Sequence, residues 1–533
     1  YGDHRDLHSL RRRQRQMCIR DRIYTLRAPP GFREFLTRGD LEGLMKRAAD
    51  LIRTRVDYEF ILVLLFLKRI SDRWRVEYER AYNEALRDGL SPEEADKEAR
   101  ADVYHDFVLT DECLWDNIRK DPNVLPERFS EALKVLAERN PELKGVVDRV
   151  DFIRFAESRE NAEILRQLVE LFSERRLYDV SPDILGDAYE WVLRYFAPEK
   201  AKEGEIYTPR EVIKLLVEIL DPKPGDRVYD PCCGSGGMLI LSYKHVEDKY
   251  GKEGALRLSL FGQEANPKIR AFCRMNLYIH DIRDADIALG DTLLYPKHRL
   301  GWFDVVMANP PWNQDGYDRD VLEKGDFHRE RFRFGYTSRQ SADWAWIQHM
   351  IAMAKDGVGR VGVVIDNGCL FRGGRERDIR SKFLESDLIE CVILLPPKLF
   401  YNTGAPGAIL ILRKSKPAER KGKVLFINAS DEFVPHPSVR KLNSLSDENI
   451  RKIADAYKRF VDIPGFSRVV DIGEIRSNNY NLNVTLYVIP VEEEEPIDIA
   501  SEFSELKRLE EECKEIERKL EEYISQIMGV IND

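Results

Sequence analysis

The sequence has 533 residues, of which 43% are hydrophobic and 33% are charged. This composition is typical of a globular protein of about three domains, and it excludes collagen-like, low-complexity and small disulfide-rich proteins. Lysine and arginine (84) are outnumbered by aspartate and glutamate (94), so the net charge is −10. That is the wrong sign for a chain that grips nucleic acid with its whole surface, although a local basic groove or a partner subunit could supply phosphate contacts.

The cysteines and the apolar runs restrict the class further. The eight cysteines include no CxxC pair, so we predict neither a zinc finger nor another metal site. We expect reduced thiols and a cytoplasmic location in a prokaryotic cell. The longest apolar run, residues 60–67, is far shorter than the roughly 20 residues of a membrane span, and indicates a buried helix segment.

The first 27 residues contain eight arginines and little that could form a core. We interpret residues 1–30 as a disordered or artefactual extension rather than as a nucleic-acid-binding arm, and assign them no function. Residues 31–196 are predicted to form a helical domain. Leu41, Leu44, Met45 and Ala48 recur at helical spacing, and residues 91–94 (Ser-Pro-Glu-Glu) are typical of a helix start.

The pattern changes within residues 197–490, where short apolar runs alternate with helical stretches. This alternation predicts a parallel, doubly wound α/β sheet. Residues 408–412 and 424–427 are expected to form antiparallel edge strands. The other predicted strands include residues 227–230, 259–264, 303–308, 361–365 and 390–395.

Residues 491–533 are predicted to be an acidic linker followed by a coiled-coil helix. Apolar residues recur every seven positions in two rows, which is the pattern of a helix that pairs with another helix. A helix packed back on its own domain is the alternative. The rows consist of Leu506, Cys513, Leu520 and Ile527, and of Leu509, Ile516 and Tyr523.

A glycine-rich segment, residues 230–238 (Asp-Pro-Cys-Cys-Gly-Ser-Gly-Gly-Met), follows the first predicted strand and opens a helix. Glycines there let the backbone turn tightly and approach a ligand. The spacing differs from the dinucleotide-binding fingerprint. An acid followed by such a turn suits S-adenosylmethionine (SAM), and points to Asp230, Gly234, Ser235, Gly236 and Gly237, although such turns are often purely structural.

Two further acids follow the next predicted strands. Glu264 stands where a carboxylate can accept hydrogen bonds from both ribose hydroxyls. Asp291 could accept a hydrogen bond from an adenine amino group, but a turn or helix-capping role explains it nearly as well. Both acids are predicted to belong to the same nucleoside site.

The sharpest motif is Asn309, Pro310, Pro311 and Trp312, directly after a predicted strand. The two prolines make a rigid bend that aims the Asn309 side chain and the Pro310 carbonyl at one point. Two acceptors suit an exocyclic amine, whose lone pair they direct at a methyl sulfonium. Trp312 would stack on the base, which must be flipped out of the duplex to enter the site.

Thr208 and Pro209 precede the first predicted strand and are typical of a helix start, with Thr208 as N-cap and Pro209 as first helical residue. Capping explains this pair completely. Exposed N–H groups at such a start could also bind the carboxylate of a methionine moiety.

Together, these motifs resemble those of N6-adenine DNA methyltransferases, and in particular the modification (M) subunits of type I restriction–modification systems. The resemblance covers roughly residues 40–530, and the glycine turn precedes the Asn-Pro-Pro motif as in the gamma group. Trp312 departs from the more common Tyr or Phe, and the paired Cys232 and Cys233 replace smaller residues. Further matching segments are residues 60–72, 204–210, 370–374 and 479–483.

The resemblance implies a Rossmann-like SAM-dependent methyltransferase sheet with SAM as methyl donor and no metal. It implies that Asn309, Pro310, Pro311 and Trp312 handle the adenine. It also implies that the segment before the sheet contacts SAM; its residues are Glu205, Ile206, Tyr207, Thr208, Pro209 and Arg210.

The same resemblance implies partners. Two M subunits would join one specificity (S) subunit, which reads the DNA sequence and is clasped by the N-terminal domain and the C-terminal helix. A restriction (R) subunit would join for cleavage. Two alternatives stay open: methylation of protein glutamine or rRNA guanine, whose enzymes share the Asn-Pro-Pro-aromatic motif, and a non-enzymatic SAM-binding scaffold.

Overall fold

The computed structural model describes residues 37–52, 58–178, 180, 182–202, 208–401, 403–436, 439–489 and 499–530. The described residues up to Val488 form one compact unit, and those after it form a second. The extension predicted for residues 1–30 and the acidic part of the predicted linker lie outside the described residues.

The described residues between 37 and 202 form helices joined by turns and contain no strand. The longest, α3, contains the apolar run: each residue from Phe60 to Ser71 in it is buried. The helix start predicted at Ser91 is confirmed, because the Ser91 hydroxyl accepts the Glu94 N–H and the Glu94 carboxylate accepts the Ser91 N–H. The helices are α2 (Arg38–Ile52), α3 (Glu59–Arg87), α4 (Pro92–Ala99), α5 (Trp115–Ile118), α6 (Leu125–Arg139), α7 (Phe152–Phe155), α8 (Arg159–Ser173) and α9 (Pro182–Lys202).

The rest of the first unit is built on a nine-stranded mixed sheet in the order β11-β8-β6-β7-β5-β4-β1-β2-β3. All strands run parallel except β7 and β11. The bounds are β1 (Arg227–Asp230), β2 (Ser259–Glu264), β3 (Asp286–Leu289), β4 (Val305–Ala308), β5 (Arg360–Asp366), β6 (Ile389–Leu394), β7 (Gly407–Arg413), β8 (Lys423–Asn428) and β11 (Ser467–Asp471), with a separate pair of β9 (Val434–Pro435) and β10 (Asn443–Ser444).

Two strands lie elsewhere than predicted. The strands expected as an antiparallel edge pair are β7 and β8, but β7 is inserted between β5 and β6, and β8 runs parallel to β6. Both have nearly continuous burial, which suits the interior of a sheet covered on two faces. The edge position is taken by β11, whose burial alternates.

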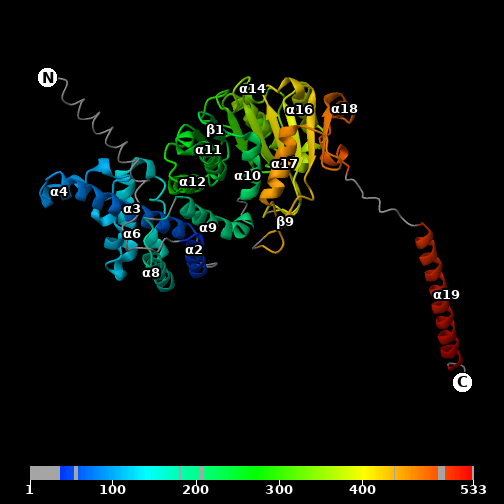
Figure 1. Ribbon diagram of the computed structural model, residues 1–533, viewed down its shortest axis with the longest axis horizontal. Helices are drawn as coiled ribbons and strands as arrows, with labels where there is room; N and C mark the ends of the chain where they lie inside the picture. The colour runs from blue at the N-terminus through cyan, green and yellow to red at the C-terminus, as the bar shows by residue number, and fades with distance from the viewer. Residues whose placement is uncertain are drawn as a thin grey trace. The chain divides into compact units, whose positions relative to one another are not determined.

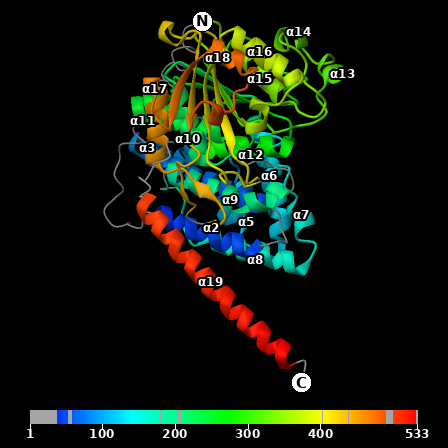
Figure 2. The ribbon, with the colours of Figure 1, turned by 90° about the vertical axis from the view of Figure 1, so that its right-hand side faces the viewer.

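Helices cover both faces of the sheet (Figure 2). One face packs against α10, α11 and α17, and the other against α15, α16 and α18. The helices of this part are α10 (Arg210–Leu220), α11 (Gly237–Ala255), α12 (Pro267–Ile279), α13 (Arg319–Leu322), α14 (His328–Arg331), α15 (Asp343–Met353), α16 (Arg375–Glu385), α17 (Asp447–Arg459) and α18 (Ile472–Ser477).

Helix α12 joins the helical part to the sheet. Its residues Phe272, Met275 and Ile279 belong to the same hydrophobic core as α3 and α9, and Figure 1 shows α9 beside α12. The buried Tyr189 hydroxyl donates to the Phe272 carbonyl at 3.2 Å. Helix α9 is therefore held against α12, which itself packs on β2 and β3.

The second unit consists of helix α19 (Ile499–Val530). Taken by itself, this helix exposes both predicted apolar rows where its side chains are described: Leu506, Leu509, Ile516, Leu520 and Tyr523 are 47–64% exposed. Pairing with another helix stays a prediction. In the described part of the chain, no helix has the length and apolarity needed to cross a membrane.

Candidate active site

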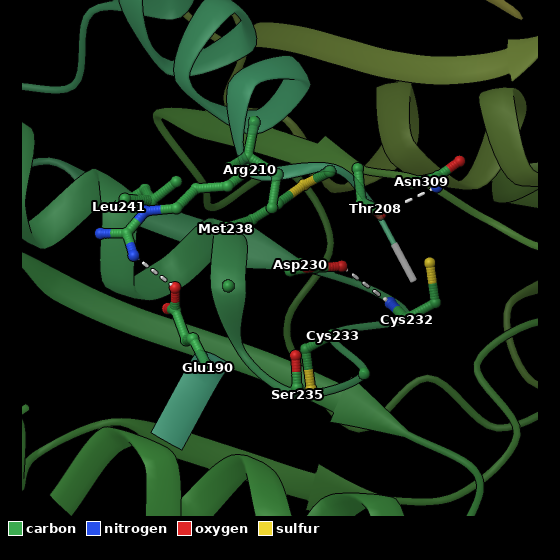
Figure 3. A pocket seen from close by; sticks show the side chains of 13 residues that line it. Glu190, Thr208, Arg210, Asp230, Cys232, Cys233, Ser235, Met238, Leu241 and Asn309 are labelled. Carbon is green, nitrogen blue, oxygen red and sulfur yellow. Dashed lines mark hydrogen bonds and ion pairs between the residues drawn. The ribbon is translucent and has the colours of Figure 1, made fainter. Parts of the chain in front are cut away.

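A pocket opens where β1 and β4 end and α10 and α11 begin (Figure 3). Its lining includes the turn after β1 and Asn309 after β4, so the glycine turn and the Asn-Pro-Pro bend lie together, as the sequence predicted. Both strands are parallel neighbours, and their carboxyl ends meet at one edge of the sheet. The lining residues are Glu190, Thr208, Arg210, Ile213, Asp230, Cys232, Cys233, Gly234, Ser235, Gly237, Met238, Leu241 and Asn309.

The glycine turn needs its glycines for conformation and for space. Gly234 and Gly236 have φ angles of 51° and 85°, in the left-handed region that side chains disfavour. A Cβ on Gly236 would lie 2.9 Å from the Cys273 Sγ. The Asn276 amide donates to the Ser235 carbonyl at 2.9 Å. The backbone of the turn is thus fixed from α12.

Asp230 ends β1 and is 3% exposed. Its carboxylate accepts the Cys232 N–H at 3.1 Å. Burial raises the pKa of Asp230 to about 7, the Cys232 N–H opposes this, and the charge of Glu264 adds to it. Near neutral pH this carboxyl is therefore present in both its neutral and its charged form, and a cation in the pocket would favour the charged form.

Glu264 lies at the end of β2, outside the pocket lining. It accepts the Gly234 N–H at 3.2 Å and the Asn266 N–H at 2.8 Å, so it ties the glycine turn to the start of α12. Burial raises the pKa of Glu264, and these N–H groups oppose the rise. The predicted ribose role remains a prediction; the structural role is visible.

Asp291, after β3, also lies outside the lining. Its two oxygens accept the Leu294 N–H at 3.2 Å and the Tyr317 hydroxyl at 2.7 Å. Burial, and then the hydrogen bond to Asp291, raise the pKa of Tyr317. The turn role that the sequence left open is therefore present, while a role toward adenine stays a prediction.

Asn309 is held at both ends of its amide. Its Nδ2 donates to the Thr208 Oγ1 at 2.8 Å, and its Oδ1 accepts the Trp312 Nε1–H at 2.9 Å. The predicted capping role of Thr208 is wrong: Pro209 is the N-cap of α10, which begins at Arg210, and no side chain caps this helix. The Thr208 hydroxyl is used for Asn309 instead.

The Trp312 ring is half-buried against the sheet. It meets Phe400 edge-on, with ring centroids 4.7 Å apart. A Cβ on Gly407, the first residue of β7, would lie 2.8 Å from the Trp312 ring, so glycine is required for this close approach. Phe400 was not predicted, because only the tertiary fold brings it to the motif.

Arg372 fixes the end of the Asn-Pro-Pro bend; it lies in residues 370–374, one of the segments that resemble the M subunits. Arg372 donates to Asn313, the residue after Trp312, at 2.7 Å and to Asp343 at 2.5 Å. Asp343 also accepts the Asn313 N–H at 2.9 Å. Asn313 itself has a positive φ of 52°. A guanidinium fork thus holds the exit of the Asn-Pro-Pro bend.

Sequence reasoning also missed Glu190. This residue of α9 lines the pocket and accepts a hydrogen bond from Arg210 at 2.6 Å, and Arg210 donates to Asp187 at the same distance (Figure 3 shows the Glu190 contact). The available signal was the three-residue spacing of Asp187 and Glu190, which puts both carboxylates on one helix face. Nothing local linked that face to the glycine turn.

The other predicted site residues divide as follows. Glu205, Ile206 and Tyr207 lie outside the described residues. Pro209, Gly236 and Pro310, Pro311 and Trp312 flank the lining without belonging to it. Among the residues that the structure describes, no group of three or more His, Cys, Asp or Glu side chains could hold a metal ion.

Comparisons with known proteins give matches over most of the chain. Residues 180–496 match the family model "N-6 DNA Methylase", and residues 41–172 match "HsdM N-terminal domain". The chain is 45% identical to the type I restriction enzyme MjaVII methylase subunit of Methanocaldococcus jannaschii over 93% of this chain and 85% of that protein. It is 31% identical to the type I restriction enzyme HindI methylase subunit of Haemophilus influenzae over 75% and 91%.

A solved structure is also similar. The methyltransferase subunit of a type I restriction-modification system from Streptococcus thermophilus superposes with a TM-score of 0.73 at 26% identity. The superposition covers 85% of this chain and all of that one. The similarity thus extends over both the helical part and the sheet.

Proposed function

Because the chain belongs to the N-6 DNA methylase family of type I restriction-enzyme methylase subunits, we propose that it methylates N6 of adenine in duplex DNA, with SAM as methyl donor. The observation that carries this proposal is the shared pocket of Asn309 and the glycine turn. A methyl donor held on the turn then lies next to the group that orients the acceptor amine.

The residues of the pocket suit SAM. The turn leaves open space at Gly234, where a Cβ would meet nothing within 4 Å, so a ligand can approach the backbone. Carboxylates of Glu190 and Asp230 and the guanidinium of Arg210 face the same space. When bound, SAM supplies an electrophilic methyl group on a positively charged sulfur, and this mixture of charges matches its sulfonium and its amino-acid end.

The chain's own residues then handle the base. Asn309 Oδ1 accepts from the adenine amine together with the Pro310 carbonyl, which favours a lone pair directed at the donor. The structure already fixes the direction of the carboxamide: Nδ2 points to Thr208 and Oδ1 to Trp312. Stacking on Trp312 offsets part of the cost of flipping the base.

We further propose that sequence selection and host protection depend on partners. The exposed apolar rows of α19 suit a helix of a specificity subunit, and the part of the chain that matches the HsdM N-terminal domain would clasp the same subunit. Two copies of this chain would join one such subunit in the cytoplasm of a prokaryotic cell, and a restriction subunit would bind for cleavage.

The test is transfer of a tritiated methyl group by the full chain co-expressed with its specificity subunit. We expect label on N6 of adenine in duplex DNA, identified by nucleoside analysis, and none in the Asn309→Ala complex. Label on protein or RNA would show a different substrate class. Absence of label, with SAM still bound, would show a scaffold.

A further inference from the structure

Glu190 is placed at the pocket by close packing of α9 on α12. Gly186, one turn earlier, lies against His280: a Cβ there would come within 1.9 Å of the imidazole. Tyr189 is buried and bonded to the Phe272 carbonyl. These two contacts hold α9 against α12, so the position of Glu190 in the lining depends on the junction between the helical part and the sheet.

Glu190 belongs to a compact charge cluster. Arg210 Nη1 donates to Asp187 Oδ1 and to Glu190 Oε2, each at 2.6 Å, and the other oxygen of Glu190 lies 3.7 Å from His280 Nε2. Burial keeps the pKa of His280 well below its ordinary value, so this histidine is neutral. Two carboxylates thus face one guanidinium at this side of the pocket.

The order of strands gives the direction of a ligand that rests on the glycine turn. The neighbours are β3, β2, β1 and β4, and they carry Asp291, Glu264, the turn and Asn309 at their carboxyl ends. An adenosine directed toward β2 and β3, with its sulfonium at Asn309, leaves its amino-acid end at the remaining polar side of the pocket. That side is formed by Arg210 and Glu190.

We propose that the Glu190–Arg210 pair is the receptor for the amino-acid end of SAM: Glu190 accepts from its α-ammonium, and Arg210 donates to its α-carboxylate. This inference rests on the proposed function and deepens it. The carboxylate and the guanidinium of the pair carry charges opposite to those of the α-ammonium and the α-carboxylate of an amino acid. Each side chain therefore exchanges its contact within the protein for an equivalent contact with the ligand. Asp187 keeps Arg210 in place during the exchange.

The proposal makes the helical part a contributor to the methyl-donor site. Glu190 comes from α9, ahead of the sheet, whereas Arg210 opens α10.

The test uses calorimetry on the full chain with three ligands. SAM carries both charged groups, decarboxylated SAM lacks the carboxylate, and 5′-methylthioadenosine lacks the whole amino-acid end. We expect Glu190→Gln to weaken SAM and decarboxylated SAM about 10- to 100-fold and to leave methylthioadenosine unchanged. Arg210→Gln should weaken SAM alone.

Glu385→Gln is the matched control, since Glu385 also pairs with an arginine, Arg476, but lies at the end of α16 and outside the lining. It should change the affinity for SAM less than about threefold. Thermal unfolding checks each variant; if Arg210→Gln does not fold, the comparison of Glu190→Gln with Glu385→Gln decides.

The proposal is overturned if Glu190→Gln leaves SAM affinity unchanged, or if it weakens methylthioadenosine as much as SAM. Failure of the proposed function looks different. The wild-type chain would then bind none of the three ligands, or would bind SAM without methylating adenine in complex with its specificity subunit.

Discussion

The two ends of the pocket are held in place by different forces. Asn309 is fixed by neutral hydrogen bonds of 2.8 and 2.9 Å to Thr208 and Trp312. Arg210, at the other end, is fixed by ion pairs to Asp187 and Glu190. A group that binds the amino-acid end of SAM, away from the reacting atoms, acts on the ground state and the transition state alike and therefore gives affinity, whereas an acceptor at the reacting nitrogen acts mainly in the transition state. The two ends should separate in kinetics: one governs kcat and the other governs binding.

The largest effect is expected from a substitution of Asn309, at the neutral end of the pocket. Asn309→Ala removes the proposed acceptor for the adenine amine and should lower kcat for methyl transfer about 10³-fold. The dissociation constant of SAM should stay within about threefold, because the variant keeps every charged group of the lining. Methyl transfer in complex with the specificity subunit and calorimetry of the chain measure the two quantities.

The control for this variant is Asn449→Ala, which removes an amide that completes the capping box of α17 with Ser446, donates to Glu432 and lies outside the pocket lining. It should leave both quantities unchanged. If Asn309→Ala instead lost SAM affinity as strongly as it lost rate, Asn309 would belong to the binding end and the contrast between the two ends would be wrong.

The next effect disturbs the support of the neutral end. Arg372→Ala leaves Asp343, which is 1% exposed, without its guanidinium and releases Asn313 behind the bend. We expect kcat to fall about 10- to 100-fold, and the free energy of unfolding to fall by about 3 kcal/mol. Arg372→Lys keeps the charge but not the fork, so it should lie in between. Unchanged kcat in a folded Arg372→Ala protein would show that the bend holds itself.

The affinity for SAM should also depend on pH, through Asp230 in the same pocket. Burial holds the pKa of Asp230 at about 7, above the ordinary value near 3.8. Protonation removes a negative charge from the pocket, so SAM affinity should fall about tenfold from pH 8 to pH 6. Asp230→Asn should bind weakly at both values, without this step. A step of equal size in the variant would assign it to another group.

The raised pKa of Asp230 also affects the free energy of unfolding, and pH changes this quantity in the direction opposite to its effect on SAM affinity. Between pH 3.8 and about 7 the folded state binds a proton at Asp230 that the unfolded state has lost. This contribution to stability is complete at low pH and is lost as pH rises through 7. Asp230 therefore destabilises the protein at the pH where we expect it to favour SAM binding most, which is the expected cost of burying a carboxyl beside a ligand.

How much the sequence predicts depends on how local each feature is. The strands around the pocket read as short apolar runs, and the glycine turn and Asn309 follow two of them directly, so topology alone brings these groups to one edge. The residues of β7 do not indicate which strands it pairs with, and its position between β5 and β6 was not predicted. Hydrophobicity reports that a strand is buried and does not say beside which strand.

Glu190 and Thr208 show the same limit at the level of side chains. Glu190 reaches the pocket only because Gly186 packs on His280, a contact between positions nearly 100 residues apart in the chain. Thr208 has all the marks of an N-cap, yet its hydroxyl accepts from Asn309. Local capping signals compete with tertiary partners, and here the tertiary partner wins.

The smallest predicted effect sharpens the description of the neutral end. Trp312→Phe keeps an aromatic face for the base and the packing on Phe400, but removes the N–H that Asn309 Oδ1 accepts. Thr208 still holds Nδ2, so the carboxamide keeps one of its two guides. A single hydrogen bond of about 1 kcal/mol corresponds to a fivefold fall in kcat, with SAM affinity unchanged.

Removing both hydrogen bonds of the Asn309 carboxamide, to Thr208 and from Trp312, should show how strongly they are coupled. Because the hydrogen bond that remains in each single variant still restricts the carboxamide, the double variant Thr208→Val with Trp312→Phe should lose more rate than the product of the two single losses. Single-turnover methyl transfer by the four proteins measures this coupling. Strict additivity would show that the indole N–H and the Thr208 hydroxyl act separately.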